Sequence, residues 1–194
     1  LGDEGWVTDL ERLRTLTPYA DDPQVLERFL TVKRQNKLRL AATLRQLRDK
    51  KLSIPCLDTS LDLTESQENA DILSTMLSHA RDLRVPYVVC WASKGDEASE
   101  EALYERVAAL LPRAEELGVG ILLKTSGIFA DTGRLRRFLE DYASDWLGAL
   151  WDMHHPYRDF GESADATIKN LGTYVKHVHL RDSDGAGDYR DSCR

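Results

Sequence analysis

The sequence predicts an α/β fold with a parallel sheet, because short apolar runs alternate with segments of helical periodicity. The apolar runs are almost continuous, as in VPYVVCW, VGILL and LGALW, which is typical of strands covered on both faces. Repeated βα units of this kind imply parallel strands joined by right-handed crossovers. Asp58, Lys124, Asp152 and His179 end four of the runs, at the edge where a (β/α) barrel carries its chemistry.

The elements follow one another in a regular order. Apolar residues at helical spacing predict helices over 38–50, 67–83, 100–117, 131 or 132 to about 142, and 164–171. Gly118 and Gly172 follow two of these helices, where glycine commonly ends a helix. Strands are predicted over 52–58, 85–91, 119–124, 147–152 and 174–180, with a weaker candidate for a sixth at 6–8.

A closed barrel needs eight strands and usually about 250 residues. We therefore expect 1–194 to be a single domain, a partial (β/α)8 barrel truncated at both ends. Strands 2–7 would be present, and the first strand and the last βα unit would be missing. An open doubly wound sheet is the weaker alternative, because the sequence has no GxGxxG or Walker-type loop.

Composition restricts the classes of partner. The chain has 33 acidic and 26 basic residues, a net charge of −7, which argues against a nucleic-acid binder. No apolar run approaches the roughly 18 residues of a membrane span, and no signal segment opens the chain. Three widely spaced cysteines predict reduced thiols in a cytoplasmic protein. The unpaired edges of a partial barrel would favour a homo-oligomer.

Four of the five histidines lie between positions 151 and 182, and Asp152 and Asp182 flank them. Imidazole and carboxylate suit Zn, Mn, Fe or Co, and histidine is the usual acid or base near neutral pH. We expect His177 and His179 to point in opposite directions, with His179 facing the barrel interior. A core histidine held by hydrogen bonds is the alternative for His179.

The stretch LGALWDMHHPYRDFGESADATIKNLGTYVKHVHLRDS resembles the sugar phosphate isomerase/epimerase family, which has a xylose isomerase-like TIM barrel. GVGILLKTSGIFADTGRLRRFL is similar to the family's fifth strand and the loop after it, and LGDEGWVTDLE is weakly similar to its second strand. The resemblance implies a small-molecule substrate, either a sugar or a sugar phosphate. It also implies a divalent metal (Mn, Mg, Co or Zn) held by Glu, Asp, His and Glu at the ends of strands five to eight.

By position, the resemblance implies that Asp152 and His179 are metal ligands. His155 matches the histidine of a D-x-x-H motif that tends to touch the sugar in the family. Arg158, also a candidate for substrate binding, and Glu162 match an H-x-x-R-x-x-x-E run, and Asp182 matches an acidic position after the metal histidine. Trp91, at a strand end, could stack on a sugar face or simply pack in the core.

Lys124 departs from the pattern, because it stands in KTSG where the family has a glutamate in an E-T-x-G context. This lysine is the catalytic candidate, and three interpretations of it are open. It could abolish metal binding, its ammonium could pair with Asp152 near the metal position, or it could form a Schiff base.

Two functions remain open. The first is metal-dependent aldose–ketose isomerisation or epimerisation through an enediolate, as the resemblance implies for full-length relatives. The second is a degenerate or truncated, non-catalytic barrel that at most binds a sugar-like ligand, which Lys124 and the absent eighth strand favour. A relative of the barrel-type apurinic-site endonucleases is disfavoured, because the chain lacks a basic surface and the many His and Glu ligands of a three-zinc cluster.

Overall fold

The computed structural model describes residues 22–180, which fall into two compact units, 22–53 and 54–180. In the first unit, helix α2 (Pro23–Asp49) begins after Asp22, whose side chain accepts a hydrogen bond from the backbone N–H of Gln24. Proline at the first helical position suits this start. The helix therefore begins earlier than the predicted position 38. The candidate strand at 6–8 lies outside the described residues.

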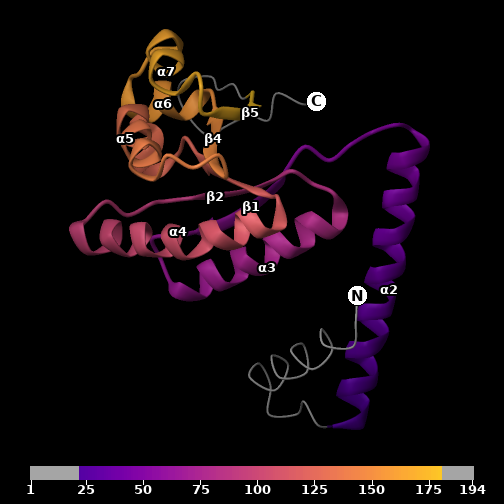
Figure 1. Cartoon of the computed structure of the whole chain (residues 1–194). Coiled ribbons are helices and arrows are strands. Elements are labelled where there is room, and N and C mark those ends of the chain that lie inside the picture. The colour runs from indigo at the N-terminus through magenta and orange to yellow at the C-terminus, as the bar shows by residue number, and fades with distance from the viewer. Residues whose placement is uncertain (1–21, 181–194) are drawn as a thin grey trace. The chain divides into compact units, whose positions relative to one another are not determined.

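The second unit contains a five-stranded parallel sheet in the order β1-β2-β3-β4-β5 (Figure 1). The strands are β1 (Leu57–Asp62), β2 (Tyr87–Trp91), β3 (Gly120–Lys124), β4 (Leu147–Asp152) and β5 (Val175–His179). Strands that are consecutive in sequence are neighbours in the sheet throughout, as in a (β/α) barrel. The predicted α/β class with a parallel sheet is confirmed, and the sheet is that of a partial barrel.

Helices connect the strands at positions close to those predicted. They are α3 (Gln67–Leu83), α4 (Glu97–Leu117), α5 (Thr132–Tyr142), α6 (His154–Phe160) and α7 (Ala164–Leu171), with a 3-10 turn η1 (Gly127–Ala130). Four of them begin after a residue whose side chain accepts a hydrogen bond from a backbone N–H of the first turn, namely Ser66, Asp96, Asp131 and Ser163. Such caps satisfy donors at the helix start. Neither α6 nor η1 was predicted.

Strand β1 differs from the prediction, which placed a strand over 52–58. It runs from Leu57 to Asp62, with alternating burial and a register irregularity between Asp58 and Asp62. Asp58 thus lies near the start of its strand rather than at its carboxyl end. The alternation places its side chain on the inner face of the sheet, where it still reaches the site described below.

The two faces of the sheet bury different sets of residues. Helices α3, α4, α5 and α7 contribute to the larger core on the outer face, which includes Val88, Cys90, Ile121, Leu123 and Ala149. Cys90 is fully buried there, as its apolar run predicts. The inner face has a small apolar floor of Val89, Leu122 and Leu150, against which Cys56 and Tyr87 pack. The polar residues Lys124 and Asp152 lie on the same face two positions after Leu122 and Leu150, at the carboxyl ends of β3 and β4.

Hydrogen bonds join the end of β1 to the end of β2. Asp62 is 6% exposed, and its carboxylate accepts from the Thr64 hydroxyl at 2.6 Å, the Thr64 N–H at 2.9 Å and the Ser93 N–H at 3.3 Å. Burial by itself raises the pKa of Asp62, but the hydrogen bonds from Ser93 and Thr64 outweigh it and hold the pKa below its usual value.

Between residues 22 and 180, no helix is long and apolar enough to cross a bilayer.

Candidate functional site

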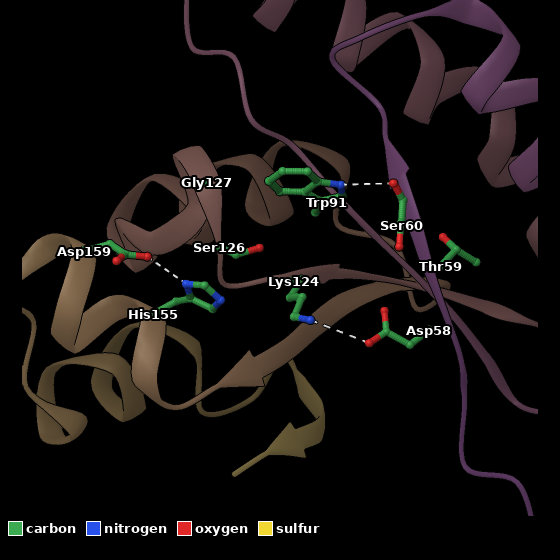
Figure 2. A pocket seen from close by; sticks show the side chains of 9 residues that line it. All are labelled: Asp58, Thr59, Ser60, Trp91, Lys124, Ser126, Gly127, His155 and Asp159. Atoms are coloured by element: carbon green, nitrogen blue, oxygen red, sulfur yellow. Dashed lines mark hydrogen bonds and ion pairs between the residues drawn. The ribbon is translucent and has the colours of Figure 1, made fainter. Parts of the chain in front are cut away.

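A pocket with a cavity volume of about 580 Å³ opens at the carboxyl ends of the central strands (Figure 2). Its lining comes from β1, from the ends of β2 and β3, from the turn after β3, and from α6. The lining residues are Asp58, Thr59, Ser60, Trp91, Lys124, Ser126, Gly127, His155 and Asp159. Most of them are polar, which suits a ligand with many hydrogen-bonding groups.

Lys124 lies at the centre of this site, at the last position of β3. Its ammonium nitrogen Nζ is 3.6 Å from Asp58 Oδ2 and 3.6 Å from Asp152 Oδ2. The side chain of Asp152 is fully buried, whereas that of Asp58 is 39% exposed. One ammonium thus lies between a buried carboxylate and a solvent-facing one, and the Lys124–Asp152 pairing considered from the sequence is present.

His155 lies on α6 and faces the pocket. Its Nδ1 is 2.7 Å from Asp159 Oδ2, and its Nε2 is 3.9 Å from Asp152 Oδ2. Asp159 follows one helical turn later, so the two side chains meet on one face of α6. The adjacent His154 does not line the pocket, and its ring lies 6.2 Å from that of Tyr157.

Trp91 ends β2, and its indole Nε1 donates to the backbone oxygen of Ser60 at 3.3 Å (Figure 2). This hydrogen bond fixes the ring beside the pocket. Gly127 also lines the pocket and has a φ of 61°, in the left-handed region that favours glycine. A Cβ at this position would lie 2.1 Å from the carbonyl oxygen of Ala92, so only glycine fits here.

Two residues of the H-x-x-R-x-x-x-E run do not line the pocket. Arg158 is exposed on α6. Glu162 instead joins α5 to α7. Its carboxylate accepts from the N–H and the hydroxyl of Thr132, and from the Thr167 hydroxyl at 2.6 Å. Glu162 therefore satisfies the first backbone donor of α5. Asp182 lies outside the described residues.

His177 and His179 share the inner face of the sheet, and their ring centroids are 5.3 Å apart. The expectation that they point in opposite directions is wrong, because residues two apart on a strand lie on the same face. His179 Nδ1 is 3.9 Å from Asp58 Oδ2. Burial lowers the pKa of His179, and the nearby Lys124 ammonium adds to this effect against the opposite influence of Asp58.

The family model of the xylose isomerase-like TIM barrel matches residues 4–192. The chain belongs to this family. No curated protein matches the sequence. Because the match covers nearly the whole sequence, it includes every residue of the pocket.

Solved structures share the fold of this xylose isomerase-like chain. They include the probable 3-DHS dehydratase AsbF from Bacillus anthracis, with a TM-score of 0.68 and 15% identity over 79% of this chain and 59% of that one. A D-tagatose 3-epimerase-like protein has a TM-score of 0.63 and 17% identity, covering 75% and 62%. The 3-keto-D-glucoside 4-epimerase YcjR from E. coli has a TM-score of 0.61 and 9% identity, covering 72% and 62%. The chain thus spans about three fifths of the length of these structures.

The side chains around Asp152 do not fit the divalent cation that the family resemblance implies. Asp152 and His179 are register partners on β4 and β5, which would suit two ligands of one ion. However, Asp152 Oδ2 already pairs with the Lys124 ammonium at 3.6 Å, and Lys124 holds the position at which the resemblance implies a glutamate ligand. A cation bound by Asp152 would have to replace this ammonium, and the buried ion pair opposes the exchange. The assignment of Asp152 and His179 as metal ligands stays a prediction.

The sequence did not single out Cys56 or Asp159 as site residues, and it placed Asp58 at the edge that carries the chemistry without giving it a specific role. Asp159 had a local signal, because it follows His155 by four residues, the spacing of neighbours on a helix face. The position of Cys56 two residues before Asp58 places both on one face of an extended chain. Their meeting with residues of β5 depends on the curvature of the sheet, for which the sequence offers no local signal.

Proposed function

We propose that this pocket binds a sugar or a similar polyhydroxylated small molecule, and that it does so without a metal ion. The ion pairs of Lys124 with Asp58 and Asp152, each at 3.6 Å, carry the proposal. They supply one positive charge beside the carboxylates without any bound cation. The family membership of the chain supports a sugar as the ligand.

The lining offers the contacts that a sugar needs. Asp58, Ser60 and His155 can accept or donate hydrogen bonds to hydroxyl groups, and Lys124 can donate to them. The Trp91 ring, held by its hydrogen bond to Ser60, offers an apolar surface for the C–H face of a sugar ring. Convergent polar groups beside one aromatic wall are typical of small-molecule sites.

The same arrangement argues against turnover by the metal-dependent route. An ammonium donates hydrogen bonds but does not draw two substrate oxygens together as a divalent cation does. Lys124 also occupies the position where the family resemblance implies a glutamate for proton transfer. A Schiff base at Lys124 is disfavoured as well, because an ion-paired ammonium has no lone pair with which to attack a carbonyl.

The test is sugar binding to the 194-residue chain in the presence of EDTA. Isothermal titration calorimetry and saturation-transfer NMR measure this binding. D-psicose, D-tagatose and D-fructose are suitable probes, because they occur in the names of structures that share the fold. We expect at least one to bind in EDTA with unchanged affinity after Mn²⁺ is added. Binding that appears only with Mn²⁺, or no binding of any probe, would overturn the proposal.

Variants locate the binding site. Trp91→Ala should weaken binding about tenfold, the loss expected for roughly 1.4 kcal/mol of contact energy. Tyr157→Ala is the matched control, because Tyr157 is an exposed aromatic residue that does not line the pocket. Asp58→Asn and the exposed Asp165→Asn form a second pair. Equal effects within either pair would place the binding elsewhere.

A second candidate function is metal-dependent isomerisation or epimerisation, favoured by the family and by neighbours that are named as epimerases. It predicts conversion between D-fructose and D-psicose, measurable by ¹³C NMR, when Mn²⁺ or Co²⁺ is supplied. Conversion that is abolished by Asp152→Ala and by His179→Ala would establish this function in place of the binding proposal.

A further inference from the structure

We propose that Cys56, His177 and His179 form a binding site for Zn²⁺, which shares His179 with the position that the family resemblance gives to a metal but does not use Asp152. One ligand atom from each residue lies within 4.8 Å of the other two. None of these three residues lines the sugar pocket. The site therefore consists of ligands that the pocket does not use.

The curvature of the sheet brings the three residues together. Cys56 immediately precedes β1, and His177 and His179 lie on β5, so the ligands come from opposite ends of the strand order. All three face the inside of the sheet. Cys56 also packs against the floor of Val89, Leu122 and Leu150, and this apolar floor limits the access of water from one side.

The ligand types select the metal. Thiolate and imidazole suit Zn²⁺, whereas Mg²⁺ and Mn²⁺ prefer oxygen ligands. Zn–S bonds of about 2.3 Å and Zn–N bonds of about 2.0 Å place tetrahedral ligand atoms about 3.3–3.6 Å apart. The present separations of up to 4.8 Å thus need a closure of about 1 Å. Three half-buried side chains can supply this by small torsional changes.

The surroundings of His179 provide an independent observation. Its Nδ1 faces Asp58 Oδ2 at 3.9 Å, and histidines that bind metals generally have a carboxylate, carbonyl or water beside the ring to orient it. With three protein ligands, the fourth position of the ion is open to water, as in catalytic zinc sites. Binding replaces the S–H bond of Cys56 by a Zn–S bond and releases the proton to solvent, with no change of oxidation state.

The test uses Co²⁺ as a spectroscopic substitute for Zn²⁺ in the full 194-residue chain, in reducing buffer. We expect one equivalent to produce a thiolate-to-cobalt charge-transfer band in the near ultraviolet and tetrahedral d–d bands, and Zn²⁺ to displace it. Mn²⁺ and Mg²⁺ at tenfold excess should not displace it. A complex without the charge-transfer band would overturn the proposal, because the ion would then be bound without Cys56.

Variants test two of the three ligands. Loss of a residue that only hydrogen-bonds to a metal ligand already weakens metal binding roughly 10–100-fold. Removal of a ligand itself should cost more, so Cys56→Ser and His177→Ala should each weaken Zn²⁺ binding at least about 100-fold. Cys90→Ala, at a cysteine buried on the opposite face, and His79→Gln, at an exposed histidine, are the matched controls. Circular dichroism of the metal-free variants checks that they fold. A folded Cys56→Ser protein with wild-type affinity would overturn the site.

Sugar binding in EDTA is measured without zinc, so its outcome does not decide the zinc site. Conversely, Cys56→Ser should bind sugar as the wild type does, because Cys56 does not line the pocket. Failure of one proposal is thus distinguishable from failure of the other.

Discussion

Lys124 Nζ lies 3.6 Å from Oδ2 of Asp152, a carboxylate that is fully buried. Removing one partner of a buried ion pair leaves the other charge uncompensated, at a cost of about 3–5 kcal/mol. We therefore expect Lys124→Met to lower the free energy of unfolding by about 3 kcal/mol, measured by urea denaturation. The exposed Lys169→Met serves as the control.

The double variant Lys124→Met/Asp152→Asn separates charge from packing. It removes both charges at once, so most of the lost stability should return. A double variant that is as unstable as Lys124→Met would show that the lysine stabilises the barrel through its aliphatic stem rather than through its charge.

Gly127 tests the turn that follows β3, and Gly118, which ends α4, is its control. Both have positive φ, 61° and 65°, but a Cβ at Gly127 meets the Ala92 carbonyl at 2.1 Å, whereas a Cβ at Gly118 meets nothing within 4 Å. Gly118→Ala should cost about 1 kcal/mol for the left-handed backbone. Gly127→Ala should cost about 2 kcal/mol more, because it adds overpacking. Thermal unfolding measures both, and equal losses would contradict the close approach.

Glu162 should contribute to stability rather than to ligand binding. Its carboxylate accepts from Thr132 and Thr167, and hydrogen bonds to a charged group contribute about 1.5–3 kcal/mol. Glu162→Ala should therefore destabilise the chain by about 2 kcal/mol and leave sugar affinity unchanged. Glu140→Ala, which breaks only an exposed pair with Arg136, should cost less than about 0.5 kcal/mol.

Asp62 predicts a pH dependence of stability. Its pKa is held below the usual value in the folded chain, where hydrogen bonds from Ser93 and Thr64 outweigh burial. The folded state therefore binds this proton less readily than the unfolded state. The stabilisation is fully present above the unfolded-state pKa of about 4 and is lost as the pH falls through the lower folded-state pKa.

Unfolding free energies at a series of pH values between 7 and 3 check this prediction. Asp62→Asn should reduce the loss of stability at acid pH, whereas Asp82→Asn, at an exposed residue of α3, should leave it as in the wild type. An unchanged acid dependence in Asp62→Asn would assign the effect to other carboxylates.

Local sequence signals predicted much of the fold. The bounds of α3, α7 and β4 agree with the sequence prediction, because Ser66 and Ser163 cap the helices and LGALWD ends at a polar residue. These features are short-range, so the sequence displays them directly. Helix α6 was missed because seven residues rich in aromatic and histidine side chains show little helical periodicity.

The site was less predictable, because its contacts are long-range. The sequence indicated that Asp58, Lys124, Asp152 and His179 lie at one edge, since parallel strands end at the same edge. His155 was placed in the site by the family resemblance alone. The sequence did not indicate that Asp58 lies 3.9 Å from His179, because that distance depends on how strongly the sheet curves between β1 and β5. The expected orientation of His177 was wrong for another reason. Side chains alternate along a strand with a period of two residues, so His177 and His179 lie on the same face.

Asp58 takes part in both proposed sites, since it lines the pocket, pairs with Lys124 and faces His179. If zinc draws His179 away from this carboxylate, the hydrogen-bonding capacity of Asp58 toward a sugar changes. Thermodynamic linkage then requires reciprocity: whatever factor zinc applies to sugar affinity, the sugar applies to zinc affinity. Asp58 would thereby couple the binding of zinc to the binding of a sugar, although the two ligands are not in contact.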